Sequence, residues 1–280
     1  MVEEKYYTCR SDKAFKYLFL NEKNKNILKE LLEFILKEKI DKITLLPTER
    51  IENTLKTRNK TVDALVQIKG KIIGIEMNSI DYSGLRSRNM AYLANIYSSY
   101  TERGNEYNED QLILQINFTY GMMHKKEGND KEKIREYYVQ DKEGKKYVKN
   151  LKIIEINMDY FVNMWYTQDK KEIEKYKYLI MLDLKEEELK KLSKDKVVEE
   201  YMEKLNSLNK DPIFKKLMTD EEDRKKYENT IKRNAKEEGI NEGIIERNIE
   251  ITKSMLEENI PIEQISKITG LTKEEIESLN

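Results

Sequence analysis

The chain has 280 residues, 38% of them hydrophobic and 38% charged, with a formal net charge of −1. This balance, together with 18 Tyr, 10 Gly and 3 Pro, excludes a low-complexity disordered chain. One cysteine, Cys9, excludes an internal disulfide, and one histidine, His124, excludes a metal site built from several histidines. Because no apolar run reaches membrane-spanning length and the acidic start is unlike a signal peptide, we expect a cytoplasmic protein without a membrane segment.

The pattern of apolar residues predicts an α/β protein whose first half runs in the order α, β-β-β, α, β. Apolar residues repeat at one-face spacing over 27–36, which is typical of an amphipathic helix. β-Branched runs on both sides of Gly70 predict a hairpin. The expected elements are helices at 11–19, 27–36 and 85–102, and strands at 43–46, 62–68, 71–77, 111–118, 137–139 and 153–156.

Two carboxylates stand inside this otherwise apolar hairpin. Asp63 begins its first strand and Glu76 comes near the end of the second, so both belong to the end away from Gly70. Alternation along a strand puts Glu76 and Asn78 on one face. Two carboxylates, a backbone carbonyl and water are the oxygen ligands that Mg²⁺ prefers, and such an ion polarises a phosphate and activates water. On spacing alone, the commoner alternative is a pair of solvated or salt-bridged charges.

The order of the elements, with Asp on the second strand and Glu on the third, resembles the PD-(D/E)XK nuclease fold. Several segments, in order along the chain, are similar to the Rpn family, the recombination-promoting nucleases also described as PD-(D/E)XK family transposases. They are SDKAFKYLF, the hairpin ending in IEM, SRNMAYLANIYSSY followed by Gly104 and Tyr107, the QIN strand, and the tail ending in ITGLTKEEIESL. The resemblance implies an αβββαβ core, a mixed sheet flanked by helices, followed by a helical C-terminal region.

The resemblance also implies a metal-dependent DNA endonuclease that uses Mg²⁺, with Mn²⁺ as a possible substitute. Carried onto this chain, it makes Asp63 and Glu76 the metal-binding carboxylates and the carbonyl of Met77 a further ligand. Asn78, as a third catalytic residue, takes the position of Lys in the broad superfamily and usually of Gln in this branch. Asn can orient a water molecule, but it cannot supply positive charge to the transition state.

Nearby charged residues could complete this site. Arg86 and Arg88 on the following helix are candidates for the missing cation, although solvated or salt-bridged arginines are the commoner interpretation. Glu30 or Glu33 could join the metal ligands, as first-helix acids do in some nucleases of this fold. The favoured interpretation of both is an exposed polar helix face.

Charge and element type divide the chain into three expected parts. Residues 1–160 form the nuclease-like domain, 161–230 a helical extension and 231–280 a helical tail. The first part carries 29 Lys and Arg against 25 Asp and Glu, a net of +4, whereas the tail carries 7 against 11, a net of −4. A nucleic-acid surface therefore belongs to the first part. Charged helices are expected from Lys170 onward, with a break at Asp211-Pro212.

The tail has the helix, glycine turn and helix of a helix-turn-helix motif. Its last helix carries one lysine, Lys273, and three glutamates, whose negative charge would be repelled by DNA phosphates. We therefore favour a self-association element that makes a homodimer, with DNA reading as the alternative.

Two classes of function remain open. The first is a Mg²⁺-dependent endodeoxyribonuclease linked to mobile elements, recombination or phage defence. The second is a catalytically degenerate relative that binds DNA or self-associates. Asp63 and Glu76 favour the nuclease, while Asn78 and the small positive charge favour the binding protein.

Overall fold

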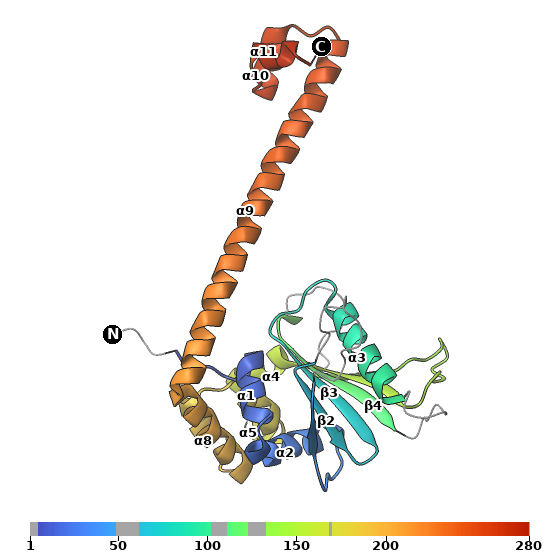
Figure 1. Cartoon of the computed structure of the whole chain (residues 1–280), viewed down its shortest axis with the longest axis vertical. Coiled ribbons are helices and arrows are strands. Elements are labelled where there is room, and N and C mark those ends of the chain that lie inside the picture. Colours follow the sequence, from blue (N-terminus) through green and yellow to red (C-terminus); the bar gives the residue numbers. More distant parts are fainter. Residues whose placement is uncertain (1–4, 49–61, 102–110, 123–132, 168–169, 280) are drawn as a thin grey trace. The chain divides into compact units, whose positions relative to one another are not determined.

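The computed structural model describes residues 5–48, 62–101, 111–122, 133–167 and 170–279 (Figure 1). By packing, the chain divides into two compact units, Met1–Phe214 and Lys215–Asn280. The division into 1–160, 161–230 and 231–280 was drawn from charge and element type, and it stays a prediction about organisation.

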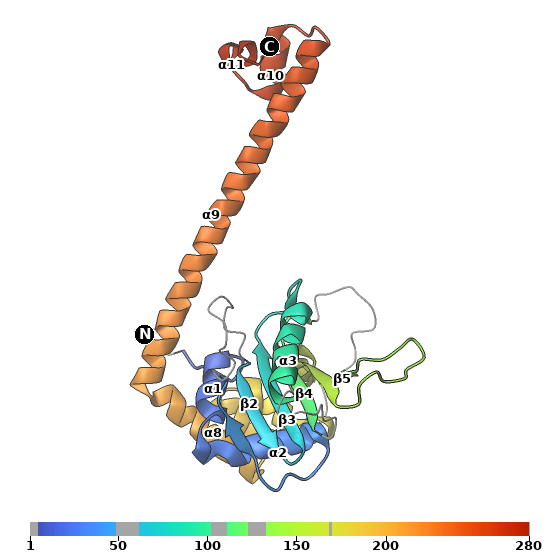
Figure 2. The same cartoon turned by 45° about the vertical axis from the view of Figure 1, so that its right-hand side comes forward.

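The first unit is built on one six-stranded mixed sheet with the strand order β1-β2-β3-β4-β6-β5 (Figure 2). Strands β3, β4 and β6 are parallel to one another, β1 and β2 are antiparallel neighbours on one side, and β5 is antiparallel on the other. The carboxyl ends of the three parallel strands therefore meet at one edge. The strands are β1 Thr44–Leu46, β2 Ala64–Ile68, β3 Lys71–Asn78, β4 Leu112–Thr119, β5 Ile134–Tyr137 and β6 Leu151–Asn157.

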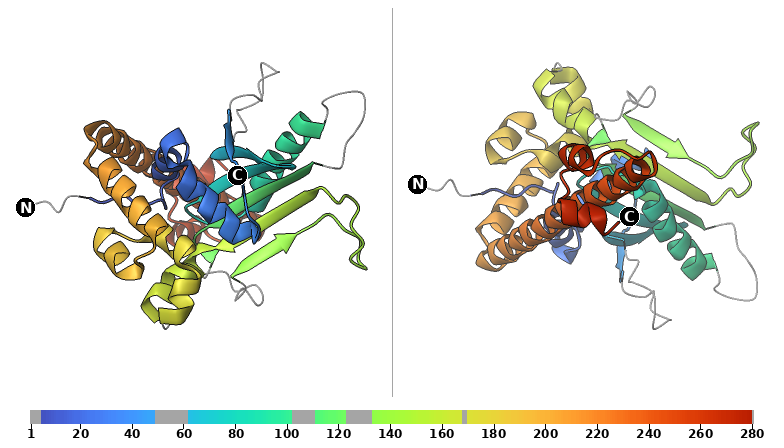
Figure 3. Two further views of the ribbon diagram at one scale, coloured as in Figure 1. Left: turned by 90° about the horizontal axis from the view of Figure 1, so that it is seen from below. Right: turned by 90° about the horizontal axis from the view of Figure 1, so that it is seen from above.

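Helices cover both faces of this sheet (Figures 2 and 3). On one face lies α3, whose Leu93 and Ile96 pack on Ile72, Ile113 and Leu151 of the parallel strands. The other face carries the larger core. Helices that precede the strands in the chain and helices that follow them both contribute residues to this core. The helices of the first unit are α1 Asp12–Phe19, α2 Lys25–Leu36, α3 Leu85–Thr101, α4 Met158–Thr167, α5 Lys170–Lys175, α6 Lys177–Ile180, α7 Glu186–Leu192 and α8 Lys196–Lys210, with 3-10 turns at Glu22–Asn24 and Met181–Asp183.

The expected elements of the first half are present, and two differences lie further along. The strand expected at 137–139 ends at Tyr137 instead, because β5 pairs through Ile134–Tyr137 with β6. Helix begins at Met158, directly after β6, rather than near Lys170, and its buried Phe161 packs into the larger core.

The predicted break between helices is confirmed. Helix α8 ends at Lys210, and the side chain of Asp211 accepts a hydrogen bond of 2.8 Å from the amide of Ile213 at the start of the next helix. Proline at the first helical position needs no amide hydrogen, so Asp211-Pro212 ends one helix and begins another.

The second unit contains most of helix α9, Pro212–Glu257, followed by α10 Ile262–Thr269 and α11 Lys273–Glu277. Ile265 and Ile276 are buried, and the side chain of Asn248 donates to the carbonyl of Thr269. The short helices therefore fold back onto the end of α9. None of the helices in the described ranges is long and apolar enough to cross a membrane.

Candidate active site

Buried polar residues gather on one face of the sheet, where the three parallel strands end. Since side chains alternate along a strand, the residues that face α3 are apolar at the start of each strand and polar at its end. The carboxyl ends of parallel strands are where open α/β sheets bind ligands. The buried polar residues are Glu76 and Asn78 on β3, Gln115, Asn117 and Thr119 on β4, and Glu155 and Asn157 on β6.

Asp63 and Glu76 are tied together at this edge. The amide of Asp63, just before β2, donates a hydrogen bond of 2.8 Å to Oε1 of Glu76. The amide of Met77 in turn donates one of 2.8 Å to Oδ2 of Asp63. The hairpin thus brings the two carboxylates together at the end away from Gly70, as their spacing indicates.

The carbonyl of Met77 faces the same side as Asp63. On β3, the carbonyl of Asn78 accepts from the amide of Tyr120 and so points toward β4. Backbone groups of successive residues in a strand point to opposite neighbours. The carbonyl of Met77 therefore points toward the Asp63 side, where it could serve as a third oxygen ligand.

Each carboxylate is paired with a cation. Nζ of Lys16 on α1 lies 2.7 Å from Oδ1 of Asp63, and an Nη nitrogen of Arg88 on α3 lies 3.5 Å from Oε2 of Glu76. The side chains of Lys16 and Arg88 are 39% and 37% exposed, against 11% and 4% for their acidic partners. The cations therefore stand at the mouth of the site, where an anionic substrate can reach them.

The carboxyl group of Glu76 is the most perturbed acid of the site. Burial, and after it the nearby Asp63 carboxylate, raises the pKa of Glu76 to about 8, while Arg88 acts in the opposite direction. Burial lowers the pKa of Lys16, but the Asp63 carboxylate more than offsets this and raises it above its ordinary value. Strongly perturbed groups of this kind are common in functional sites.

Asn78 is held at both ends of its amide. Its Oδ1 accepts a hydrogen bond of 2.5 Å from Arg88, and its Nδ2 donates one of 3.1 Å to Oγ1 of Thr119. Thr119 donates in turn to Oε1 of Glu155, whose Oε2 accepts a bond of 3.1 Å from Asn117. A hydrogen-bonded chain therefore runs across three strands from the helix arginine to a buried glutamate.

Three residues of this arrangement were missed by the sequence analysis. Lys16 lies in the quoted segment SDKAFKYLF, but a helix lysine far from the hairpin gave no sign of its contact with Asp63. Glu155 did carry a signal, since it stands in the apolar strand Ile-Ile-Glu-Ile. Thr119 follows the QIN strand and is a common residue at strand ends.

Other predicted candidates lie elsewhere or act differently. The exposed helix face expected for Glu33 is wrong: Glu33 is buried, and its carboxylate accepts hydrogen bonds from the amide of Ile40 and from Lys39, beyond the end of α2. Glu30 borders a shallow hollow on the same helix. Arg86 acts electrostatically on Glu155, whose pKa is raised mainly by burial. His124 lies outside the described residues.

The donors present suit a hard divalent cation with a small protein ligand set. Within the described ranges, no three His, Cys, Asp or Glu side chains come together as a metal-binding group. The set is therefore Asp63, Glu76 and the Met77 carbonyl, which leaves positions for water and substrate oxygens. Mg²⁺ is commonly held in this way, through one or two carboxylates.

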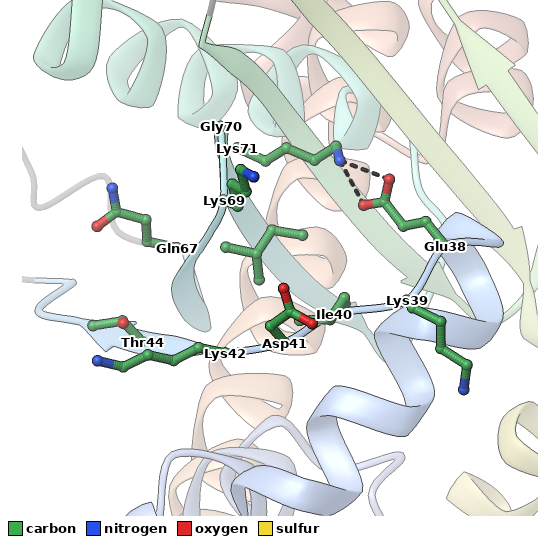
Figure 4. Close-up of a pocket in the computed structure, with 11 residues that line it drawn as sticks. Glu38, Lys39, Ile40, Asp41, Lys42, Thr44, Gln67, Lys69, Gly70 and Lys71 are labelled. Carbon is green, nitrogen blue, oxygen red and sulfur yellow. Dashed lines mark hydrogen bonds and ion pairs between the residues drawn. The ribbon is translucent and has the colours of Figure 1, made fainter.

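Cavity volume does not mark this site. A hollow of about 490 Å³ lies at the opposite end of the hairpin, beside the Gly70 turn (Figure 4). There Lys71 pairs with Glu38 at 2.5 and 2.7 Å, and the described lining includes none of the candidate site residues.

A six-stranded mixed sheet flanked by helices, with an Asp–Glu pair at the end of its hairpin, defines an α/β protein consistent with the PD-(D/E)XK nucleases. The family model described as PD-(D/E)XK nuclease family transposase matches residues 9–238, and the chain belongs to this family. No curated protein and no solved structure is a significant match to it. The resemblance predicted from the sequence segments is confirmed, and the family's description indicates a nuclease linked to transposition.

Proposed function

We propose that this protein is a metal-dependent endodeoxyribonuclease that hydrolyses phosphodiester bonds in DNA during recombination, mobile-element transfer or phage defence. The observation that carries the proposal is the pair Asp63 and Glu76, joined through each other's backbone at the carboxyl edge of the parallel strands. The family's description supports it.

Asp63, Glu76 and the carbonyl of Met77 would hold a Mg²⁺ ion, for which Mn²⁺ can substitute. When bound, such an ion polarises the phosphate and lowers the pKa of a coordinated water. Before the ion arrives, Lys16 neutralises the Asp63 carboxylate, and Arg88 lies beside the carboxyl group of Glu76. For a metal ion to bind, Lys16 and Arg88 must therefore weaken their contacts with Asp63 and Glu76.

Hydrolysis adds the oxygen of a water molecule to phosphorus, breaks one phosphorus–oxygen bond and releases an alcohol and a phosphate monoester. Negative charge builds up on the phosphate oxygens and on the departing oxygen. Cationic groups that are already in place stabilise this charge best. Lys16 and Arg88, each more than a third exposed, are the described cations beside the two carboxylates that can meet it.

The second candidate function is a catalytically degenerate protein that binds DNA. It is favoured by Asn78, because each end of its amide already bonds Arg88 or Thr119 and the side chain supplies no positive charge of its own. Loss of the superfamily lysine without replacement would leave a fold that binds but does not cleave.

The C-terminal region supplies the proposed homodimer contact. Ile240 and Ile244 lie one turn apart on α9 and are exposed, as is Ile245. A second copy of the chain could cover this exposed apolar stripe. The single cysteine, Cys9, is buried and free, which suits the reducing cytoplasm that we propose as its location.

Plasmid nicking tests the proposal. Wild type should nick supercoiled DNA with Mg²⁺ or Mn²⁺ and not with EDTA, and Asp63→Ala should be inactive because an anionic ligand is gone. Asp41→Ala, at an exposed aspartate of the same unit, is the matched control. Equal background nicking by wild type and Asp63→Ala would leave the binding-protein function in its place.

A further inference from the structure

We propose that Arg88 supplies the positive charge that residue 78 lacks, and that Asn78, Thr119 and Glu155 are positioning residues that hold Arg88 in place. The proposal rests on the proposed nuclease function and adds a catalytic cation to it. Neither the family assignment nor the sequence pattern settles where that cation comes from.

The guanidinium of Arg88 lies just beyond the tip of residue 78. One of its nitrogens is 2.5 Å from Oδ1 of Asn78 and 3.5 Å from Oε2 of Glu76. A lysine side chain extends further than an asparagine, so an ammonium group at position 78 would reach this same space. The helix arginine thus puts a charge where the superfamily puts its lysine, next to the acidic pair.

The polarity of the hydrogen-bonded chain determines which end of Asn78 meets Arg88. Thr119 uses its one hydroxyl proton on Glu155, so its oxygen can only accept from Asn78. Nδ2 of Asn78 therefore faces Thr119, and Oδ1 is left to accept from Arg88. A flipped amide would set donor against donor at Arg88 and acceptor against acceptor at Thr119.

Glu155 anchors this chain within a buried network. It is 7% exposed, and its second oxygen accepts from Asn117, whose own carbonyl oxygen accepts a bond of 2.8 Å from Gln115. Oε1 of Gln115 and Nε of Arg88 have no hydrogen-bond partner among the described residues, but the bonds between Gln115, Asn117, Glu155 and Thr119 link the members of this buried chain to one another. Fixed placement of this kind is what a transition-state cation needs. Two tyrosine rings, Tyr82 and Tyr92, lie 5.9 and 5.5 Å from the Arg88 guanidinium and restrict it further.

Lys16 is the competing source of charge, and the geometry separates the two. Its ammonium pairs with Asp63, whereas the guanidinium of Arg88 bonds Asn78 directly. A charge moved to residue 78 would therefore replace that of Arg88 and not that of Lys16.

The first test transplants the charge. Single-turnover cleavage of DNA at saturating Mg²⁺ is compared for wild type, Arg88→Met and the double variant Arg88→Met with Asn78→Lys. We expect Arg88→Met to lose about 10- to 1,000-fold in rate, the range for removing one group that stabilises developing charge, and the double variant to regain at least about tenfold. Asn78→Lys combined with Lys16→Met should show no such recovery over Lys16→Met alone.

The second test addresses the positioning residues. Thr119→Val and Glu155→Gln should lower the single-turnover rate while DNA affinity, measured by fluorescence anisotropy in Ca²⁺, stays the same. Thr119→Ser, which keeps the hydroxyl, should restore the rate. Thr44→Val on β1 and Glu136→Gln on β5 are matched controls at exposed strand positions of the same sheet.

Metal affinity gives a readout that does not depend on cleavage. Removing the cation beside Glu76 should make Arg88→Met bind Mn²⁺ several-fold more tightly by calorimetry at a pH above the pKa of Glu76, where no proton competes with the ion and one repulsive charge is gone. A misfolded variant would bind more weakly. Tighter binding together with slower cleavage is therefore expected only if Arg88 acts on the reaction.

The outcomes distinguish this inference from the proposed function. If wild type and Asp63→Ala cleave equally, both the function and the inference are overturned. If wild type is active but Arg88→Met cleaves as fast, or if Asn78→Lys gives it no recovery, the function stands and the inference is overturned.

Discussion

The amide of Asp63 donates a hydrogen bond of 2.8 Å to Oε1 of Glu76, so the start of one strand holds the acid at the end of the next. This bond favours the charged form of Glu76, yet burial and the Asp63 carboxylate outweigh it and raise the pKa to about 8. The metal-free site therefore keeps a proton that a divalent cation has to displace.

The first prediction concerns pH and the stability of the metal-free protein. An acid whose pKa is higher in the folded than in the unfolded state stabilises the fold below its unfolded pKa, near 4.5, and loses this contribution as pH rises through its folded pKa, near 8. Thermal unfolding in EDTA should thus show falling stability between about pH 4.5 and 8, by on the order of a few kcal/mol. Mn²⁺ affinity should rise over the same window.

Glu76→Gln separates this effect from the titration of other groups. The variant cannot ionise, so its unfolding temperature should fall less with pH than that of wild type. A wild-type profile that parallels the Glu76→Gln profile would contradict the raised pKa. Glu38→Gln, at a partly exposed glutamate in an ion pair with Lys71, is the control.

The second prediction concerns Lys16. Its ammonium lies 2.7 Å from Asp63 and competes with a metal ion for the same oxygen. Lys16→Met should therefore bind Mn²⁺ more tightly by calorimetry, by several-fold, whereas Lys13→Met on the same helix should not. Unchanged affinity in Lys16→Met would mean that the lysine moves aside at no cost.

The hairpin and its acids could be predicted because the information is local. Strand alternation and the turn at Gly70 place Asp63 and Glu76 at one end without knowledge of the rest of the fold. The amphipathic period over 27–36 and the strand at 111–118 were equally local, and α2 and β4 confirm them.

The rest of the site depends on packing between distant segments. The contact of Lys16 with Asp63 exists because α1 packs beside β3, and no sequence spacing encodes that distance. Thr119 and Glu155 become neighbours only because β6 pairs with β4 in parallel, with Thr119 opposite Asn157. A single charged residue inside an apolar strand indicated something at Glu155, but not its partner.

The third prediction distinguishes a structural acid from a metal ligand. Glu33 accepts hydrogen bonds from the amide of Ile40, at 2.8 Å, and from Lys39. Glu33→Ala leaves that buried amide without a partner, which costs about 1–3 kcal/mol of folding free energy in urea unfolding. Its cleavage rate, measured well below the unfolding temperature, should match that of wild type. A loss of Mn²⁺ binding in this variant would place Glu33 among the ligands after all.

The fourth prediction concerns self-association through α9. Ile240 and Ile244 are about half exposed, at 52% and 53%, and lie one helical turn apart, so they present one apolar stripe to a partner. Replacing both by serine should lower the mass seen by light scattering toward that of one chain, without changing the helix content seen by circular dichroism. Two negatively charged tails repel each other, so apolar contact has to outweigh this repulsion for a dimer to form. Salt screens the repulsion, and added salt should therefore strengthen the wild-type association.

Ile268→Ser provides the control, since Ile268 on α10 is 65% exposed but lies off this stripe. It should leave the mass unchanged. If the Ile240 and Ile244 variant keeps the wild-type mass but binds DNA more weakly, the tail reads nucleic acid instead. The helix-turn-helix interpretation would then replace dimerisation, because the same exposed stripe would be serving a different partner.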